Sequence, residues 1–476
     1  MIAQTLFPPK SPSLIFKSYF RSKVINEIYN SEFKSSPTKG IDRLNGLHFQ
    51  KQANNQIKII RKKCLAGNYK FSPYLELLQS KGRGKEPRVL AIPTIRDRIV
   101  LYLLKEILSE IFPECVPKKL ANTYIYQIRK FISDKTLSEF SIYKADIEKF
   151  YDSIDREILF KKLQSKIKSR KLMTLIKSAV STPIVPKHYH RKDISEYCKK
   201  SQHKGIPQGL SISNILASIY LHDLDCELNN HDFIDVYYRY VDDILIFTKQ
   251  EVINETEAIF QDKLQRLALK INEGKSCKKR GHEQFEYLGY RFELPKVTIR
   301  EATLEKFIHS IAAKFSSYTY SKQKKLKNLQ ENNYDLEKLK EIFVAELNEK
   351  ITGAISENKR YGWIFYFNAI TDVSLLYKID KIIAGFFKRL EDFGRTAPPE
   401  LKKISRAFYE AKYNPTGGYI HNYNNYKTVE EKGAFLSDRG RLIRDKGYSA
   451  QEINDLYESF KQKNLSELEQ DDAFLY

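Results

Sequence analysis

The spacing of apolar and polar residues predicts a mixture of helices and strands between about residues 41 and 300. Arg88–Pro93 alternates like a short strand, whereas Arg98–Ile111 carries apolar residues at helical spacing. Ser141–Asp146 and Val236–Phe247 are rich in Ile, Val, Tyr and Phe, which is typical of strands. Beyond about residue 300 the strand signals become sparse. The pattern therefore predicts an α+β fold that ends in a mainly helical part.

The same pattern divides the chain into four parts. Residues 1–40 are rich in Ser and Pro around a helical stretch near 14–29, and we expect them to form an N-terminal extension. Residues 41–300 form the mixed part and residues 301–395 a helical part, in which 372–390 has one apolar helical face. Two prolines near 398 mark a boundary. Residues 396–476 are then expected to be a small accessory region with an acidic tail.

The net charge points to a polyanionic partner. Among 476 residues, 81 are Lys or Arg and 59 are Asp or Glu, which gives a net charge of +22. Half of this surplus lies in residues 160–204, where 13 basic side chains accompany 2 acidic ones. Such a block is expected along a phosphate backbone, although a Lys-rich composition alone also raises the charge. Nucleic acid is the simplest partner.

The cysteines and the apolar runs bear on the cellular compartment. The five cysteines form no C-x-x-C pair, so a zinc ribbon or a disulfide framework is not expected, and their number suits a reducing cytosol. The N-terminus lacks the pattern of a signal peptide, and the longest uncharged run, Gly205–His222, is too polar to span a bilayer. We therefore expect a cytoplasmic protein of bacterial type that has no membrane partner.

Two adjacent acidic residues stand between two strand-like segments. Asp242 and Asp243 follow a run of Tyr and Val and precede Ile-Leu-Ile-Phe, which predicts a strand, a two-residue acidic turn and a second strand. Like charges this close raise each other's pKa unless cations neutralise them. A generic Asp-Asp turn is the alternative. Asp146 ends another predicted strand and is the expected third ligand, whereas Asp155 is expected to be a helix N-cap and Asp152 to be structural.

Three carboxylates at neighbouring strand ends are suited to a pair of magnesium ions. Oxygen ligands without His or Cys favour Mg²⁺ over zinc, with Mn²⁺ as a substitute. Two such ions ~3.5–4 Å apart would activate a primer hydroxyl and stabilise a leaving pyrophosphate. The expected cofactor is therefore two Mg²⁺ ions.

Four further stretches appear in an order that carries a family resemblance. Arg88–Val100 resembles a fingers motif, Lys144–Asp155 resembles motif A, Lys204–Ser211 resembles motif B, and Tyr240–Asp243 is the Y-x-D-D box of motif C. Over about residues 75–300, and more weakly to about 390, the chain resembles reverse transcriptases of the group II intron and retron lineage. The resemblance implies a right-hand polymerase with fingers, a palm built on an antiparallel sheet, and a helical thumb.

The resemblance also implies roles for individual residues. It makes Asp146, Asp242 and Asp243 the catalytic carboxylates, and it makes these three together with Ile147 the metal ligands. It assigns nucleotide binding to five residues. Lys81 (or Lys85) and Arg88 would bind the triphosphate, and Tyr151 would block the sugar 2′ position. Gln208 would lie beside the nascent base pair, and Lys275 would act as general acid. Tyr151 as a core residue and Lys275 as a surface lysine are the alternatives. The primer grip is expected in the hairpin that contains Tyr287, Leu288 and Gly289.

Departures from the family pattern narrow the biological expectation. No Cys/His nuclease region follows the polymerase motifs, Tyr124–Ile128 replaces a Gly-Phe-Arg-Pro-rich stretch, and Val297-Thr298 is not followed by the Gly of retron thumbs. The chain is therefore most similar to solitary, defence-associated (abortive-infection-type) reverse transcriptases. The resemblance implies that it copies a dedicated noncoding RNA into DNA from deoxynucleoside triphosphates in antiphage defence.

Two alternatives stay open. One is a group II intron maturase or a retron reverse transcriptase, and the other is a catalytically retired RNA-binding scaffold. The priming mode is not determined by the sequence, and neither is assembly into a homo-oligomer.

Overall fold

The computed structural model describes residues 11–80, 84, 86–134, 139–193, 196–197, 204–330, 334–443 and 446–473. Contacts group the chain into two compact units. The first contains residues 1–119 and 138–281, and the second contains residues 120–137 and 282–476. Each unit is described by itself below. The four-part division expected from the sequence stays a prediction.

The first unit begins with helices that pack on its core. The helical stretch expected near residues 14–29 is two helices, α1 (Pro12–Tyr19) and α2 (Ser22–Ile28), because Arg21 takes an extended conformation between them. The π-helical turn η1 (Tyr29–Phe33), α3 (Gly46–Phe49), the 3₁₀ turn η2 (Gln50–Gln52) and α4 (Ala53–Ala66) follow. Phe16 and Phe20 are buried, and α1 packs against α5 (Ile95–Ile111). The N-terminal residues therefore belong to the core of this unit.

A three-stranded sheet with the order β2-β1-β4 forms the fingers side of this unit. Strands β1 (Tyr74–Gln79) and β2 (Arg88–Ile92) pair antiparallel, and β4 (Ile184–Val185) joins β1 in parallel. The predicted strand at 88–93 and the predicted helix at 98–111 are both confirmed. Helix α5 begins at Ile95 because the Thr94 side chain accepts a hydrogen bond from the Asp97 N–H.

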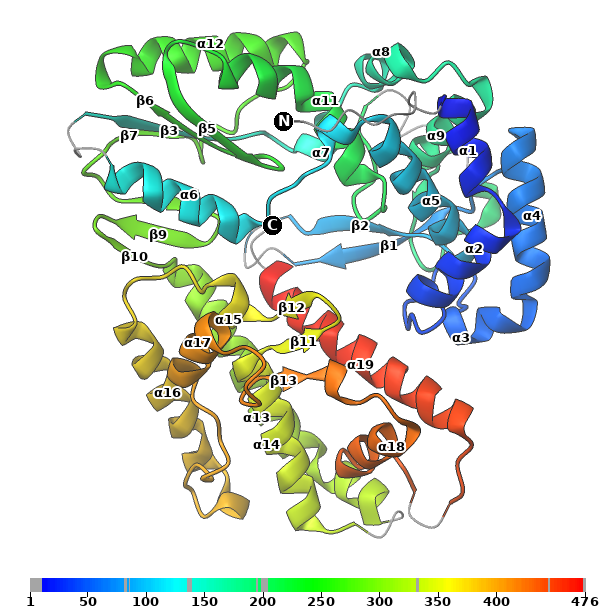
Figure 1. Ribbon diagram of the computed structural model, residues 1–476, viewed down its shortest axis with the longest axis vertical. Coiled ribbons are helices and arrows are strands. Elements are labelled where there is room, and N and C mark those ends of the chain that lie inside the picture. The colour runs from blue at the N-terminus through cyan, green and yellow to red at the C-terminus, as the bar shows by residue number, and fades with distance from the viewer. Residues whose placement is uncertain are drawn as a thin grey trace. The chain divides into compact units, whose positions relative to one another are not determined.

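A second, four-stranded sheet, which we call the palm sheet, has the order β5-β6-β3-β7. Its strands are β5 (Ile234–Tyr240), β6 (Asp243–Thr248), β3 (Ser141–Asp146) and β7 (Cys277–Arg280), all antiparallel to their neighbours. Helix α12 (Ile253–Arg266) covers one face, where the Tyr143 and Phe260 rings lie 5.8 Å apart (Figure 1). The predicted strands at 141–146 and 236–247 are confirmed.

The remaining helices of the first unit surround the palm sheet and the fingers sheet. Helix α11 (Ser213–Asn229) packs against β5 and α12. The other elements are α7 (Phe150–Ser153), α8 (Arg156–Lys166), α9 (Arg170–Ser181) and the 3₁₀ turns η3 (Pro113–Cys115), η4 (Arg191–Asp193) and η5 (Gln250–Val252). The predicted α+β class is confirmed by this combination of helices with two sheets.

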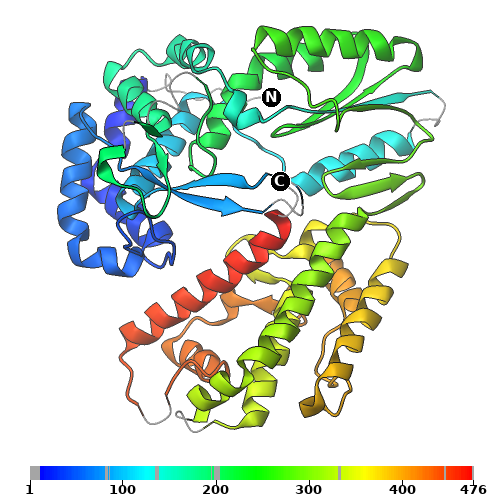
Figure 2. The same cartoon turned by 180° about the vertical axis from the view of Figure 1, so that it is seen from behind.

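The second unit is mostly helical, as Figure 2 shows from behind. It contains α6 (Ala121–Ser133), α13 (Glu301–Gln330), α14 (Leu336–Thr352), α15 (Trp363–Tyr366) and α16 (Ser374–Phe386). A meander of β8 (Phe285–Tyr287), β9 (Tyr290–Glu293) and β10 (Lys296–Ile299) precedes α13. Edge-on contacts among the rings of Phe315, Phe343 and Phe387 form part of its core.

Residues 396–476 share a core with the segment that follows α14. Strand β13 (His421–Asn422) pairs with β11 (Ala354–Ser356), which also pairs with β12 (Lys359–Tyr361). This part also contains the helices α17 (Ile404–Tyr413), α18 (Val429–Asp438) and α19 (Ala450–Ala473) and the 3₁₀ turn η8 (Tyr423–Asn425). Two further 3₁₀ turns, η6 (Phe387–Arg389) and η7 (Glu391–Phe393), come just before it in the chain. None of the helices in the described part of the chain is both long enough and apolar enough to cross a bilayer.

Candidate active site

The three predicted acidic ligands come together at one end of the palm sheet. Asp146 is the last residue of β3, and Asp243 is the first residue of β6, directly opposite it in the antiparallel register. Side chains of directly opposed residues have Cβ atoms about 4.5–5.5 Å apart. Asp242 precedes Asp243 in the β5–β6 turn. The structure thus brings three acidic residues, drawn from two separated segments, to the same end of the palm sheet.

The turn itself differs from the expectation in one residue. The sequence predicts that both aspartates form the turn, but Asp243 is already part of β6 and pairs with Tyr240, so the two turn residues are Val241 and Asp242. Val241 has a φ of 57°, which is an uncommon conformation for a β-branched residue. Arg239, which is ion-paired with Asp225, donates a hydrogen bond of 3.0 Å to the Val241 carbonyl. This bond holds the tight turn and therefore positions Asp242.

The electrostatics of the cluster favour a bound cation. Burial, together with the charges of Asp243 and Asp146, raises the pKa of Asp242 to about 6, although the nearby Lys275 lowers it in part. Lys275 Nζ lies 2.9 Å from Asp146 Oδ2. One lysine does not neutralise three carboxylates. A set of oxygen donors with excess negative charge fits hard divalent cations such as Mg²⁺.

Two residues that the sequence did not nominate hold Asp146. The Asn272 side chain donates to Asp146 Oδ2 at 3.2 Å, and its N–H donates to the Asp146 carbonyl at 2.7 Å. The Asp146 N–H donates to Ser276 Oγ at 3.4 Å. Asn272 and Ser276 both lie close in sequence to Lys275, so a closer look at the polar residues around that lysine would have found them.

Ile147 was expected to offer its carbonyl oxygen to a metal. It lies opposite Ile271 in an isolated antiparallel bridge. The flanking residues make the backbone hydrogen bonds: the Glu148 N–H donates to the Lys270 carbonyl, and the Asn272 N–H donates to the Asp146 carbonyl. In such a pair the N–H and C=O groups of the central residues point away from each other. The carbonyl of Ile147 therefore points away from Ile271, which leaves the expectation open.

Tyr151 lies close to the carboxylates and to the fingers strand. Its hydroxyl donates to Asn214 Oδ1 on α11 at 2.5 Å. Burial raises the pKa of Tyr151 well above its ordinary value, the nearby charge of Asp242 raises it further, and Arg88 lowers it. Arg88, Tyr151 and Asp242 are therefore close enough to interact electrostatically. No sequence pattern pointed to Asn214, because only the fold brings α11 to this ring.

The segment that contains Gln208 makes hydrogen bonds both to β2 and to Tyr151 of α7. The Gln208 carbonyl accepts a 2.7 Å hydrogen bond from the Ala91 N–H, and the Ile206 N–H donates to the Tyr151 carbonyl at 2.8 Å. Gly209 has a φ of 93°, and a Cβ atom there would lie 3.0 Å from the Ala91 carbonyl oxygen. A glycine is thus needed for this close approach.

Asp155 has the structural role expected of it. Its side chain accepts hydrogen bonds from the Glu157 and Ile158 N–H groups at 2.8 and 3.1 Å, so it is the N-cap of α8. This acidic residue of the motif A stretch is therefore a cap and not a member of the carboxylate cluster.

The predicted primer grip forms a hairpin in the second unit. Leu288 and Gly289 have φ values of 49° and 79° and make the tight turn between β8 and β9. Tyr287 and Leu288 are buried, and the Leu288 carbonyl accepts a 3.1 Å hydrogen bond from the Tyr366 hydroxyl. Contact with a primer stays a prediction for these residues. Lys81, expected at the triphosphate, lies outside the described residues, as does Lys85.

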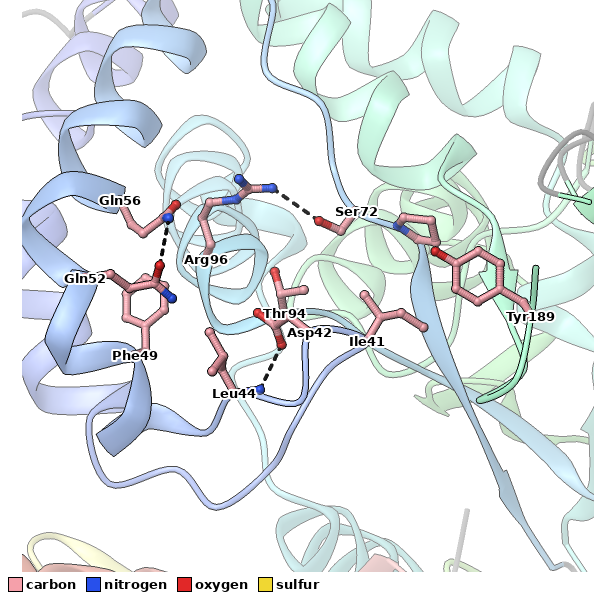
Figure 3. A pocket seen from close by; sticks show the side chains of 11 residues that line it. Ile41, Asp42, Leu44, Phe49, Gln52, Gln56, Ser72, Thr94, Arg96 and Tyr189 are labelled. Carbon is pink, nitrogen blue, oxygen red and sulfur yellow. Dashed lines mark hydrogen bonds between the residues drawn. The ribbon is translucent and has the colours of Figure 1, made fainter. Parts of the chain in front are cut away.

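A cavity of about 530 Å³ in the first unit is lined by other residues (Figure 3). Arg96 donates to Ser72 Oγ at 3.2 Å beside it, and burial raises the pKa of Asp42, which also lines it. Tyr189 lies on the opposite side of the cavity. None of the predicted catalytic or nucleotide-binding residues lines this cavity, so it is separate from the carboxylate cluster.

Comparison with known families identifies the central part of the chain. Residues 80–292 match the family described as "Reverse transcriptase (RNA-dependent DNA polymerase)". The matched range contains the fingers strand β2, the palm sheet, the carboxylate cluster and the predicted primer-grip hairpin. The motifs quoted above thus lie within the matched residues.

Individual relatives agree with this match. The chain is 30% identical over 199 residues to "Group II intron-encoded protein LtrA" of Lactococcus lactis, which is 40% of this chain and 31% of that protein. It is 25% identical to "Protein YkfC" of Escherichia coli (40% and 50%) and 28% identical to an "Uncharacterized 91 kDa protein in cob intron" of Schizosaccharomyces pombe (45% and 26%). The chain thus spans half or less of the length of these relatives. A telomerase structure from Candida tropicalis aligns with 54% of this chain and 61% of that one, at a TM-score of only 0.38 and 15% identity.

Proposed function

Because residues 80–292 match the reverse transcriptase family, we propose that the protein is an RNA-directed DNA polymerase. Its substrates would be an RNA template and deoxynucleoside triphosphates, and its product would be DNA. The chain adds single nucleotides to a primer hydroxyl with release of pyrophosphate. This reaction is a nucleotidyl transfer.

One observation supports this proposal above the others. Asp146 and Asp243 lie opposite each other on adjacent strands with Asp242 in the adjoining turn, and burial together with the charges of Asp243 and Asp146 raises the pKa of Asp242 to about 6. A structural turn does not require three acidic groups whose mutual repulsion is balanced by one lysine. A site that binds divalent cations does require such a set.

Asp146, Asp242 and Asp243 would hold two Mg²⁺ ions, with the Ile147 carbonyl as a further ligand. Such ions lower the pKa of an attacking hydroxyl and neutralise charge on a leaving pyrophosphate. Mn²⁺ has similar ligand preferences and would substitute.

The remaining residues bind and orient the nucleotide. Arg88 on β2 binds the triphosphate, since a guanidinium is suited to phosphate oxygens. The Tyr151 ring, fixed by Asn214, occupies the space of a ribose 2′ hydroxyl and so favours deoxynucleotides. Gln208 contacts the nascent base pair. Lys275, whose side chain is largely exposed and whose amine pairs with Asp146, donates a proton to the pyrophosphate.

The direct test is primer extension on an RNA template with purified protein, in Mg²⁺ and separately in Mn²⁺. We expect deoxynucleotide incorporation by the wild type and none by Asp146→Asn. The matched control is Asp223→Asn, which removes an exposed carboxylate that pairs with Lys162 on the surface. Binding of RNA by the wild type without incorporation in either metal would instead support the retired scaffold.

We further propose that the template is a dedicated noncoding RNA and that synthesis serves antiphage defence in the bacterial cytoplasm. The basic block at residues 160–204 supports RNA binding. A plaque assay that compares the wild type with an Asp242→Ala/Asp243→Ala variant tests the defence role. Equal plaquing in both, with no protection by the wild type, would contradict it.

An intron-associated role is the second candidate, because two of the relatives bear names that refer to introns. Sequencing of the nucleic acid that co-purifies with the protein, with and without DNase and RNase treatment, separates the two. An intron RNA would favour the maturase, a retron RNA the retron enzyme, and an unrelated short RNA the defence role.

A further inference from the structure

Glu114, Cys115 and His222 form a second cluster of ligand-type side chains in the first unit. One ligand atom from each lies within 4.8 Å of the ligand atoms of the other two. Glu114 and Cys115 are in the 3₁₀ turn η3, and His222 is in the middle of α11, which packs against that turn. None of them belongs to the carboxylate cluster or to the nucleotide-binding residues.

Cys226 extends this cluster along α11. It follows His222 by four positions, so both side chains lie on the same face of the helix. Cys226 Sγ lies 3.6 Å from His222 Nε2. With zinc–sulfur and zinc–nitrogen bonds of about 2.3 and 2.0 Å, two ligands of one tetrahedral ion stand about 3.5 Å apart. The thiol and the imidazole are thus already spaced as two ligands of one ion.

The donor set distinguishes between classes of metal. Two thiols, one imidazole and one carboxylate are ligands of zinc and similar soft divalent ions, not of Mg²⁺ or Ca²⁺. We propose that Glu114, Cys115, His222 and Cys226 bind one zinc ion. All four side chains are from the protein, so the site is closed and structural in type.

Binding requires the side chains to adjust, because Cys226 Sγ lies near His222 but is not among the ligand atoms that are within 4.8 Å of one another. Glu114 Oε1 lies 4.0 Å from Cys115 Sγ and 2.7 Å from Lys166 Nζ. The Lys166–Glu114 pair is on the surface, where an ion pair contributes little to stability, so a metal can displace the lysine. Cys226 and His222 are reachable from solvent, whereas Cys115 is buried. A metal ion could therefore enter from the solvent side, past Cys226 and His222, and bind the buried Cys115.

The ion would join two elements that lead to the polymerase site. Turn η3 directly follows the end of α5, and α11 begins at Ser213, close after the Gln208 segment. A metal that links η3 to α11 would hold the latter helix against the fingers side of the unit. Since a structural zinc stabilises only the folded state, its removal is expected to lower the thermal midpoint by several degrees.

The test is the zinc content of the full chain after purification and dialysis against metal-free buffer, measured by mass spectrometry of the metal. We expect about one zinc per chain in the wild type, and less than one fifth of that in Cys115→Ser and in His222→Asn. The matched controls are Cys277→Ser and His309→Asn, which lie outside the cluster and should retain the zinc. Asp243→Asn should also retain it, which excludes zinc held by the carboxylates.

Cobalt provides a second readout that does not depend on activity. Co²⁺ added to metal-free protein should give a thiolate charge-transfer band, which is weakened in Cys226→Ser, a change at an exposed side chain that should leave folding intact. No zinc above the level of Cys115→Ser, or no cobalt–thiolate band in the wild type, would overturn the proposal. Equal zinc in all variants would overturn it too, because the metal would then be bound elsewhere.

Discussion

The first unit contains two clusters of ligand-type side chains that differ in chemistry and in origin. The carboxylate cluster has only oxygen donors, carries excess negative charge and lies where two strands of the palm sheet meet. The Glu114–Cys115–His222–Cys226 cluster has sulfur and nitrogen donors and lies between a 3₁₀ turn and a helix. The first suits exchangeable hard ions that take part in chemistry, and the second suits one tightly held soft ion.

This difference suggests that the two clusters do separate work. Ions at the carboxylates must contact substrate oxygens, so their coordination must stay partly open. An ion that is surrounded by four protein ligands has no position left for a substrate and can only stabilise the fold. Variants of one cluster should therefore change the reaction, while variants of the other should change metal content and stability.

The largest effect is expected from Asp243→Asn. It should lower the rate of deoxynucleotide incorporation by at least ~10³-fold, because the ligand contributes several kcal/mol of transition-state stabilisation. Single-turnover primer extension at saturating Mg²⁺ measures the rate. Cys115→Ser is the companion variant and should change this rate by less than threefold at a temperature where it is folded. A thousandfold loss in Cys115→Ser would erase the distinction between the clusters.

Tyr151→Ala should raise the use of ribonucleotides relative to deoxynucleotides by about 10–200-fold, because removal of the ring opens space for a 2′ hydroxyl. The ratio of kcat/KM for the two substrates measures it. Tyr151→Phe keeps the ring, loses only the hydrogen bond to Asn214, and should retain the selectivity. Unchanged selectivity in Tyr151→Ala would place the ring in the core and not at the sugar.

In the metal-free protein, the repulsion among the carboxylates should make the free energy of unfolding depend on pH. The folded pKa of Asp242 is about 6, above the unfolded value of ~3.9. Stability is therefore lost as pH rises from about 4 to about 6 and stays lost above that range. In chelator at pH 7.5, Asp242→Asn should be more stable than the wild type by ~1–3 kcal/mol.

Denaturant unfolding at pH 7.5 and pH 4.5 checks this, and the advantage of the Asn variant should shrink at the lower pH. Saturating Mg²⁺ should stabilise the wild type and not Asp242→Asn. An Asn variant that is less stable than the wild type in chelator would show that the cluster carries no uncompensated repulsion.

The smallest effect is expected from Asp155→Ala. This variant tests whether an acidic residue that caps a helix behaves differently from the acidic residues proposed to bind metal. Loss of the bonds from the Glu157 and Ile158 N–H groups should lower the free energy of unfolding by ~1 kcal/mol. The rate of DNA synthesis should fall far less than in Asp243→Asn. Thermal denaturation measures the first quantity, and a rate loss comparable to that of Asp243→Asn would show that Asp155 belongs to the reaction.

The sequence alone determined the local parts of this protein. The strand at 88–93 and the helix at 98–111 follow from apolar periodicity. The strands at 141–146 and 236–247 follow from their content of Ile, Val, Tyr and Phe, which suits β3 and β6 because both are buried on both faces. Asp146, Asp242 and Asp243 could be nominated because each stands at the end of a strand-like segment. Short strands such as β11 and β13 could not be predicted, because two or three residues are too few to show a periodic pattern of apolar positions.

Only the tertiary structure decided which distant residues meet. The register of β3 against β6 put Asp146 opposite Asp243, and the packing of α11 brought Asn214 to Tyr151. The cysteines showed no metal spacing along the chain, yet η3 and α11 bring Cys115 close to His222, with Cys226 beside it on α11. The physical reason is that periodicity reports which face of an element is buried, whereas the partner of that face is set by long-range packing.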